Sequence, residues 1–96
     1  WITLNIGGKH FTTSKSNITE KEPSSMLARM FADENDHYWM KPSLRDASGA
    51  YLIDRSPLYF EPILNYLRNG QIIIDKNVNP RGVLEEAEFY GIFFDT

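Results

Sequence analysis

The residue types that most often carry enzymatic chemistry are few in this chain, and they are not spaced for it. Its two histidines, His10 and His37, fall in an expected strand and in a polar stretch, and neither belongs to a metal-binding or catalytic-triad motif. His10 lies on the strand face that we expect to point outward, so we interpret it as an ordinary exposed residue. The sequence therefore predicts no catalytic residue and favours a protein that is not an enzyme.

One acidic stretch has the chemistry of a metal site, because carboxylates and an imidazole follow one another closely in Asp33, Glu34, Asp36 and His37. The stretch lacks the spacing and the central glycine of a calcium loop, so we interpret it as a solvated acidic loop. The absence of cysteine excludes disulfides, thiolate zinc sites and a cysteine nucleophile, and it suits a reducing compartment. We therefore expect neither a metal nor a cofactor.

The composition predicts one small folded domain. The chain has 96 residues, 42% of them hydrophobic, with two tryptophans, five tyrosines and six phenylalanines. A domain of this size has a thin margin of stability and often gains further burial by self-association. The net charge of −3 offers no basic excess for nucleic acid, and no apolar run approaches the roughly 18 residues of a membrane span. The chain opens on a strand pattern without a signal-peptide layout, so we expect a cytoplasmic or nuclear location.

Hydrophobic periodicity and turn residues predict the elements that would position any functional side chain. Ile2, Leu4 and Ile6 alternate as in a half-buried strand, and the Gly7-Gly8 pair supplies a two-residue hairpin turn. The elements expected along the chain are a hairpin over 1–13, a short helical turn over 14–18, a serine-capped helix after 25, a polar loop over 32–46, a central strand over 49–55, a helix over 57–69 kinked at Pro62, a short strand over 71–75 and a last helix over 80–90. We therefore predict an α/β (α+β) domain with a small mixed sheet covered by about four helices.

The last expected helix carries an aromatic residue outside its core face. A helical wheel assigns the core face to Val83, Leu84, Ala87 and Tyr90, and the opposite face to Glu85, Glu86 and Glu88. Phe89 falls among the glutamates and points away from the core. It is either an incidental exposed residue or an anchor for a partner, because aromatic residues dominate binding hot spots.

Two further segments leave alternatives open. Tyr38, Trp39 and Met40 are bulky residues in the polar loop, and they need cover from the domain itself, from a neighbouring subunit or from a partner. Asp54 and Arg55 end an otherwise apolar strand, and they form either a local salt bridge or a subunit contact.

Several strings of the sequence resemble, in order, the BTB/POZ domains of the potassium-channel-tetramerisation-domain (KCTD) family. They are LNIGGKHFTT at 4–13, PSSML at 23–27, GAYLIDRSP at 49–57, FEPILNYLRNG at 60–70 and VLEEAEFYGI at 83–92. The resemblance implies a single BTB/POZ domain over 1–96 that forms tetrameric or pentameric rings. It also implies an adaptor that docks on cullin-3 in a ubiquitin ligase and binds its target protein outside this domain. Channel relatives often carry a histidine–cysteine zinc site between subunits, which a chain without cysteine lacks.

The resemblance also suggests which residues make these contacts. Phe89 matches a cullin-contact aromatic of the family, and Phe31 with Asp33 loosely fits a second cullin-contact pattern, although the loop after Phe31 is longer than in most members. The candidate cullin-binding residues are Phe31, Asp33, Tyr38, Trp39 and Phe89. The candidate subunit-interface residues are Asn5, Arg45, Asp46, Asp54 and Arg55. The alternative function is a purely structural assembly domain, channel-like or scaffold, without a ligase.

Overall fold

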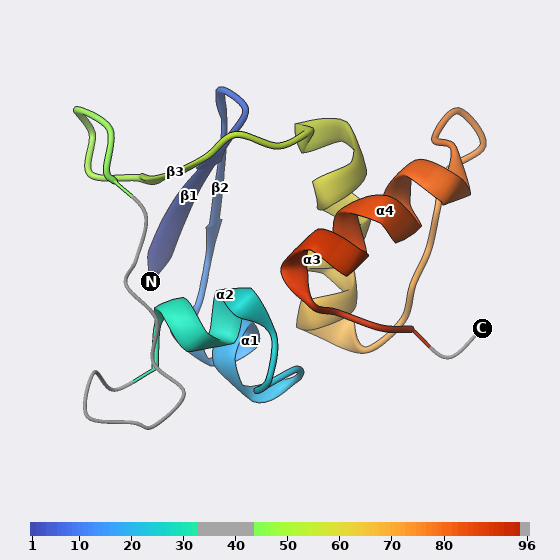
Figure 1. Ribbon diagram of the computed structural model, residues 1–96, viewed down its shortest axis with the longest axis horizontal. Helices are drawn as coiled ribbons and strands as arrows, with labels where there is room; N and C mark the ends of the chain where they lie inside the picture. Colours follow the sequence, from blue (N-terminus) through green and yellow to red (C-terminus); the bar gives the residue numbers. More distant parts are fainter. Residues whose placement is uncertain (33–43, 95–96) are drawn as a thin grey trace.

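The computed structural model describes residues 1–32 and 44–94 (Figure 1). Its elements within these ranges are β1 (Ile2–Ile6), β2 (Lys9–Thr13), α1 (Lys15–Glu20), α2 (Met26–Met30), β3 (Tyr51–Ile53), α3 (Pro57–Asn69) and α4 (Pro80–Tyr90). In Figure 1 the sheet lies on one side and the α3–α4 pair on the other, while α1 and α2 lie together near the end of the sheet where β1 begins. The predicted α+β fold, with a small mixed sheet, an N-terminal hairpin and four helices, is confirmed.

β1 is the central strand of a mixed sheet whose order is β2-β1-β3. It pairs antiparallel with β2, which puts Asn5 opposite His10, and parallel with β3, which puts Asn5 beside Leu52. Gly7 and Gly8 form the turn with φ angles of 57° and 101°, a region that favours glycine. The predicted two-residue hairpin is confirmed, and it fixes which side chains share a face of the sheet.

Two strand predictions are wrong. The strand expected over 49–55 comprises only Tyr51–Ile53 and lies at the edge of the sheet, because the hairpin makes β1 central and leaves β3 to pair with the other edge of β1. The stretch over 71–75 is not a strand. Its Ile72 and Ile74 pack partly buried against the core, which accounts for the alternating pattern without a strand ladder.

Local capping explains where the helices begin and end. Ser14 and Ser25 each accept a hydrogen bond from a backbone N–H of the first turn of α1 and α2, at 3.3 and 3.1 Å. Pro57 begins α3, and Gly70 ends it with a positive φ of 80°. The helix continues through Pro62, so the kink expected there stays a prediction.

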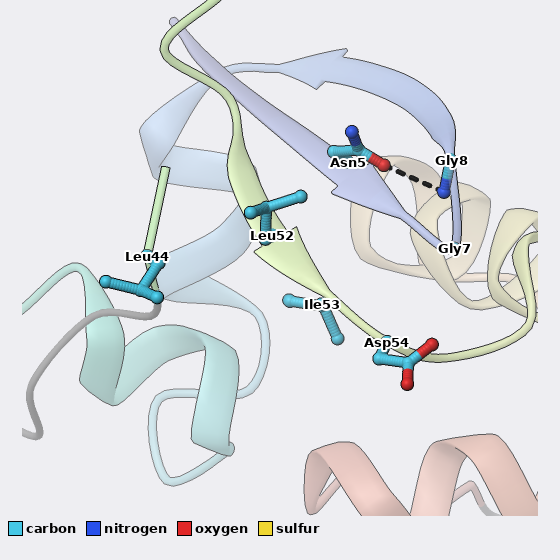
Figure 2. Close-up of a pocket in the computed structure, with 7 residues that line it drawn as sticks. All are labelled: Asn5, Gly7, Gly8, Leu44, Leu52, Ile53 and Asp54. Atoms are coloured by element: carbon cyan, nitrogen blue, oxygen red, sulfur yellow. Dashed lines mark hydrogen bonds between the residues drawn. The ribbon is translucent and has the colours of Figure 1, made fainter. Parts of the chain in front are cut away.

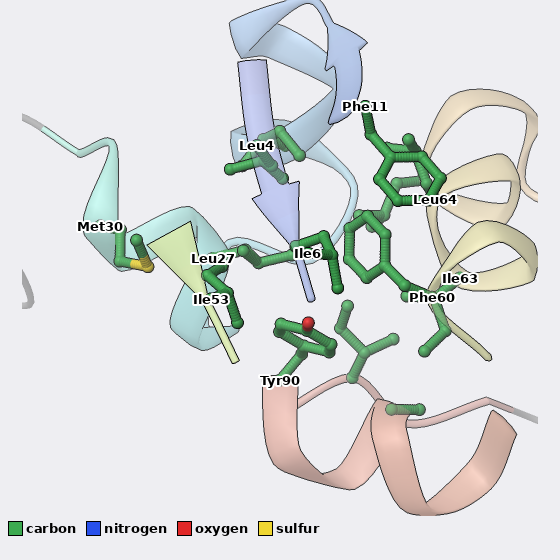
Figure 3. Close-up of a cluster of buried hydrophobic side chains, with 14 of the residues drawn as sticks. Leu4, Ile6, Phe11, Leu27, Met30, Ile53, Phe60, Ile63, Leu64 and Tyr90 are labelled. Atoms are coloured by element: carbon green, nitrogen blue, oxygen red, sulfur yellow. The ribbon is translucent and has the colours of Figure 1, made fainter. Parts of the chain in front are cut away.

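A single hydrophobic cluster joins the sheet to the helices (Figure 3). The ring of Phe60 on α3 lies between two others, with centroids 5.2 Å from Phe11 of β2 and 5.2 Å from Tyr90 of α4. Figure 3 shows Tyr90 reaching from α4 toward Ile6 and Ile53 of the sheet. The core therefore holds α4 in a fixed position relative to β3.

α4 differs from the helical wheel at two positions. Leu84, expected in the core, is 49% exposed, and Glu86, expected in solvent, is 7% exposed. The buried face is therefore rotated toward Glu86, with Val83 and Tyr90 fully buried beside it. A carboxylate is tolerated there because Arg55 forms an ion pair with it.

Candidate functional site

The side of the sheet that points away from the core is the first candidate surface, and we call it the outer sheet face. It consists of side chains that are half-buried or exposed, namely Thr3 and Asn5 of β1, His10 and Thr12 of β2, and Leu52 of β3. The hydroxyls of Thr3 and Thr12 form a hydrogen bond of 3.0 Å across the hairpin. The outer sheet face is therefore mainly polar, in contrast to the apolar face on the core.

Asp46 connects the outer sheet face to the turn that precedes β3. Its Oδ2 accepts a hydrogen bond from Asn5 Nδ2 at 2.9 Å and lies 2.9 Å from His10 Nε2. Its Oδ1 accepts hydrogen bonds from the Ser48 hydroxyl at 2.6 Å and from the Ala50 backbone N–H at 3.0 Å. The side chain of Ser48, followed by those of Asn5 and His10, holds the pKa of Asp46 well below its ordinary value. Asp46 therefore carries a negative charge at neutral pH.

His10 is the residue of this network that sequence reasoning missed. We expected His10 to be an ordinary exposed residue. In the structure its side chain is half-exposed and contacts the carboxylate of Asp46. One signal was available, because a two-residue turn sets the hairpin register and puts His10 opposite Asn5. No sequence signal indicated the contact between His10 and Asp46, because Asp46 lies 36 residues away along the chain.

A pocket of about 550 Å³ adjoins the outer sheet face (Figure 2). It is lined by Asn5, Gly7, Gly8, Leu44, Leu52, Ile53 and Asp54. Leu44 and Leu52 are exposed, and the Leu52 N–H donates a 2.7 Å hydrogen bond to the Leu44 carbonyl. Nearby, the guanidinium of Arg45 lies 4.4 Å from the ring centroid of Tyr51. An apolar patch with an acidic rim at Asp54 therefore borders the polar network.

The second candidate surface lies on the side of α4 and is built around Phe89. The side chain of Phe89 is 42% exposed, which confirms the outward position that the wheel predicts. The Arg55 guanidinium carbon lies 4.2 Å from the centroid of the Phe89 ring. The ring also meets Tyr90 edge-on, with centroids 5.0 Å apart. We call Arg55, Glu86 and Phe89 together the Phe89 clamp.

An ion pair forms the base of the Phe89 clamp. Arg55 Nε and Nη2 donate to the two carboxylate oxygens of Glu86 at 3.0 and 2.9 Å. The side chains of Arg55 and Glu86 are 33% and 10% exposed. The hydrogen bonds to Glu86 raise the pKa of Arg55. Arg55 therefore forms a salt bridge within the domain, but with Glu86, 31 residues away along the chain, and not with the neighbouring Asp54.

Among the remaining candidate residues, Phe31 is described by the structure and joins neither surface. Phe31, at the C-terminal end of α2, is buried, and its ring packs edge-on against Tyr51 with centroids 4.9 Å apart. Asp33, Tyr38 and Trp39 lie outside the described residues. The docking roles of these residues stay predictions.

Among residues 1–32 and 44–94, no three or more histidine, aspartate or glutamate side chains lie together in a group that could hold a metal ion. Within the same ranges, no helix has the length and apolarity needed to cross a membrane.

Comparison with known proteins identifies the family. A sequence profile described as BTB/POZ domain matches residues 2–95. The BTB/POZ domain-containing protein KCTD9 of Mus musculus is 58% identical over 92 residues, which are 96% of this chain and 26% of that protein. KCTD5 of Bos taurus is 47% identical over 96% of this chain and 37% of its own length, and KCTD17 of Homo sapiens is 48% identical over 96% and 27%. This chain thus spans between 26% and 37% of the length of these relatives. It belongs to the BTB/POZ domain family and, within it, to the KCTD proteins, and it is a module for protein interaction and oligomerisation.

Proposed function

We propose that this domain is a non-enzymatic module that assembles with copies of itself into a tetrameric or pentameric ring and docks cullin-3. It would act in the cytoplasm or nucleus as part of a ubiquitin-ligase adaptor whose target protein binds outside this domain. Membership of the BTB/POZ family supports self-association and protein binding in general. The observation that carries the docking role is Phe89, an aromatic residue left 42% exposed on α4 beside the exposed Glu85 and Glu88.

The outer sheet face supports self-assembly. A ring requires each subunit to meet its two neighbours through two different patches. The outer sheet face combines a hydrogen-bonded polar network around Asp46 with exposed Leu44 and Leu52, a mixture found at many interfaces. The proposed interface residues at or beside this face are Asn5, Arg45, Asp46 and Asp54. Arg55, the fifth candidate, follows them along the chain, but its guanidinium is already paired with Glu86.

Two matched leucine variants test the assembly. Leu52 lies on the outer sheet face at 40% exposure, and Leu58 lies on α3 at 52% exposure. Light scattering at micromolar concentration should give a tetramer or pentamer for the wild-type domain and a lower mass for Leu52→Arg, because a charge at an interface must be desolvated. Leu58→Arg should leave the mass unchanged. A monomeric wild-type domain, or a Leu52→Arg ring of full mass, would contradict the proposed interface.

The surroundings of Phe89 indicate what kind of partner surface fits it. Glu85 and Glu88, its neighbours on α4, are both exposed. A complementary surface therefore offers an apolar pocket for the ring and basic residues at the rim of that pocket. Binding at such a rim should weaken as the salt concentration rises.

A quantitative cullin-3 binding assay tests the docking role. Phe89→Ala should weaken cullin-3 affinity by at least about 2 kcal/mol, or roughly thirtyfold, while the mass of the assembly stays unchanged. Phe93→Ala is the matched control, because Phe93 is 74% exposed just beyond α4. If Phe89→Ala binds cullin-3 as the wild-type domain does, the anchor role is refuted. If the wild-type domain does not bind at micromolar concentration, the alternative of a purely structural assembly domain is favoured.

A further inference from the structure

We propose that Arg55 and Glu86 are positioning residues that hold the Phe89 ring in the orientation it uses for docking. This inference rests on the proposed docking role of Phe89 and adds how that side chain is made ready for a partner. The contribution of Phe89 to partner affinity then depends on the Arg55–Glu86 ion pair, even if the partner does not contact that pair.

The backbone of Arg55 is fixed by the sheet. Its N–H donates a 3.0 Å hydrogen bond to the carbonyl of Ile53, the last residue of β3. Its own carbonyl oxygen lies against Gly7, so closely that a Cβ on Gly7 would collide with it. The side chain of Arg55 therefore starts from a defined point between the hairpin and α3.

The ion pair then fixes the guanidinium. Glu86 is anchored within α4, and its side chain is 10% exposed. Two parallel hydrogen bonds of 3.0 and 2.9 Å set the plane of the Arg55 guanidinium as well as its position. A lysine could supply the charge but not this two-bond geometry.

The fixed guanidinium in turn restrains Phe89. With the guanidinium 4.2 Å from the ring centroid and the Tyr90 ring 5.0 Å away edge-on, the Phe89 ring has contacts on two sides, while the residue remains 42% exposed. A side chain that is ordered before binding loses less rotamer freedom when the partner arrives. Loss of the restraint should therefore weaken docking by about three- to tenfold, less than removal of the ring itself.

The experiment measures the ring directly and the binding separately. A fluorine label on the Phe89 ring reports its environment by NMR in the assembled domain without any partner. Arg55→Met removes the guanidinium and keeps most of the apolar stem, and Arg81→Met is the control, because Arg81 forms an exposed 3.6 Å pair with Glu85 on the same helix. Arg55→Met combined with Glu86→Gln replaces the single variant if the unpaired carboxylate of Glu86 prevents folding.

The expected NMR result is a shifted and narrowed fluorine resonance in the Arg55 variant and an unchanged one in Arg81→Met. Cullin-3 affinity should fall about three- to tenfold in Arg55→Met and should not fall further when Arg55→Met is added to Phe89→Ala. Arg55→Lys should recover little of the loss, because it restores charge alone.

An unchanged fluorine resonance in Arg55→Met overturns the positioning role even if cullin-3 binds. Equal losses in the presence and absence of the Phe89 ring would also overturn it, because the ion pair would then act only on the fold. A wild-type domain that fails to bind cullin-3 refutes the proposed function, while the NMR result still decides the positioning role.

Discussion

The two ion pairs of α4 should contribute very differently to stability, although both join an arginine to a glutamate. Arg55–Glu86 has two short hydrogen bonds and side chains 33% and 10% exposed, whereas Arg81–Glu85 has a 3.6 Å separation and side chains 87% and 66% exposed. Exposed pairs are weak, because water competes for both charges and two long side chains must be ordered. We therefore compare Glu86→Gln with Glu85→Gln, which remove one charge each and keep the size of the side chain.

The geometry gives the expected size of each effect. The amide of Glu86→Gln can accept one of the two Arg55 hydrogen bonds, and its NH₂ group faces the other donor. Breaking a fully buried pair costs about 3–5 kcal/mol, but Arg55 is a third exposed and can recover some hydration, which brings the expected cost to about 2 kcal/mol. Glu85→Gln should cost less than about 0.5 kcal/mol. The loss in Glu86→Gln should persist at high salt, because a largely buried pair is poorly screened.

Urea unfolding at a single protein concentration measures both variants, since assembly makes apparent stability depend on concentration. The urea concentration at the midpoint of unfolding should fall clearly for Glu86→Gln. The dependence of the unfolding free energy on urea concentration (the m-value) should change little, because the fold remains the same. Adding Arg55→Met to each variant completes a double-mutant cycle, with coupling expected for Glu86 and none for Glu85. If Glu86→Gln costs no more than Glu85→Gln, the Arg55–Glu86 pair is not closed in solution, and the basis of the Phe89 clamp is lost.

Three other changes test other parts of the structure. Tyr90→Phe should leave stability unchanged or raise it by up to about 1 kcal/mol, because the buried Tyr90 hydroxyl has no hydrogen-bond partner among the described residues; calorimetry that finds a clear loss would show a partner. Asp46→Asn should destabilise the domain at neutral pH and matter less in acid. The pKa of Asp46 is lowered on folding, so its contribution is present above the ordinary pKa of 3.8 and is lost as the pH falls through the lowered value; equal effects of the variant in urea titrations at neutral pH and at about pH 2.5 would contradict this. Gly82→Ala should destabilise α4, although alanine normally favours a helix by about 1 kcal/mol, because its Cβ would lie 2.5 Å from ring carbons of Tyr59; a raised melting temperature would show that the ring moves aside.

Local patterns predicted the parts of the fold that depend on near neighbours. The Gly7-Gly8 turn and the serine cap before the helix after residue 25 act within a few residues, and each element that they predict is present. The central position expected for the strand over 49–55 was wrong, because strand order depends on which edges of β1 remain free after the hairpin forms. Nothing in the periodicity of one segment reports that choice.

The candidate surfaces were also predictable only where their residues depend on near neighbours in the chain. Phe89 was correctly expected outside the core, because a helical wheel needs only the helix itself. Glu86 was assigned to solvent because it is charged, although its wheel position is next to that of Tyr90; the wheel cannot include a cation from another element. Arg55 lies 31 residues earlier in the chain, and only the tertiary fold, in which α4 packs against α3, brings the two together. Long-range ion pairs of this kind leave no periodic signal.

A very short stretch of chain connects the proposed assembly surface to the proposed docking surface. Leu52 lies on the outer sheet face, and Arg55 of the Phe89 clamp follows it by three positions, with the Arg55 N–H bonded to the end of β3. The orientation of the Phe89 clamp relative to the proposed subunit interface is therefore set by one strand and one ion pair, without a flexible linker. A ring built through the outer sheet face would repeat the Phe89 clamp at fixed spacing and in one orientation around its axis. The Asp46 network and the Phe89 clamp share no side chain, so the backbone from Leu52 to Arg55 is the short connection between them.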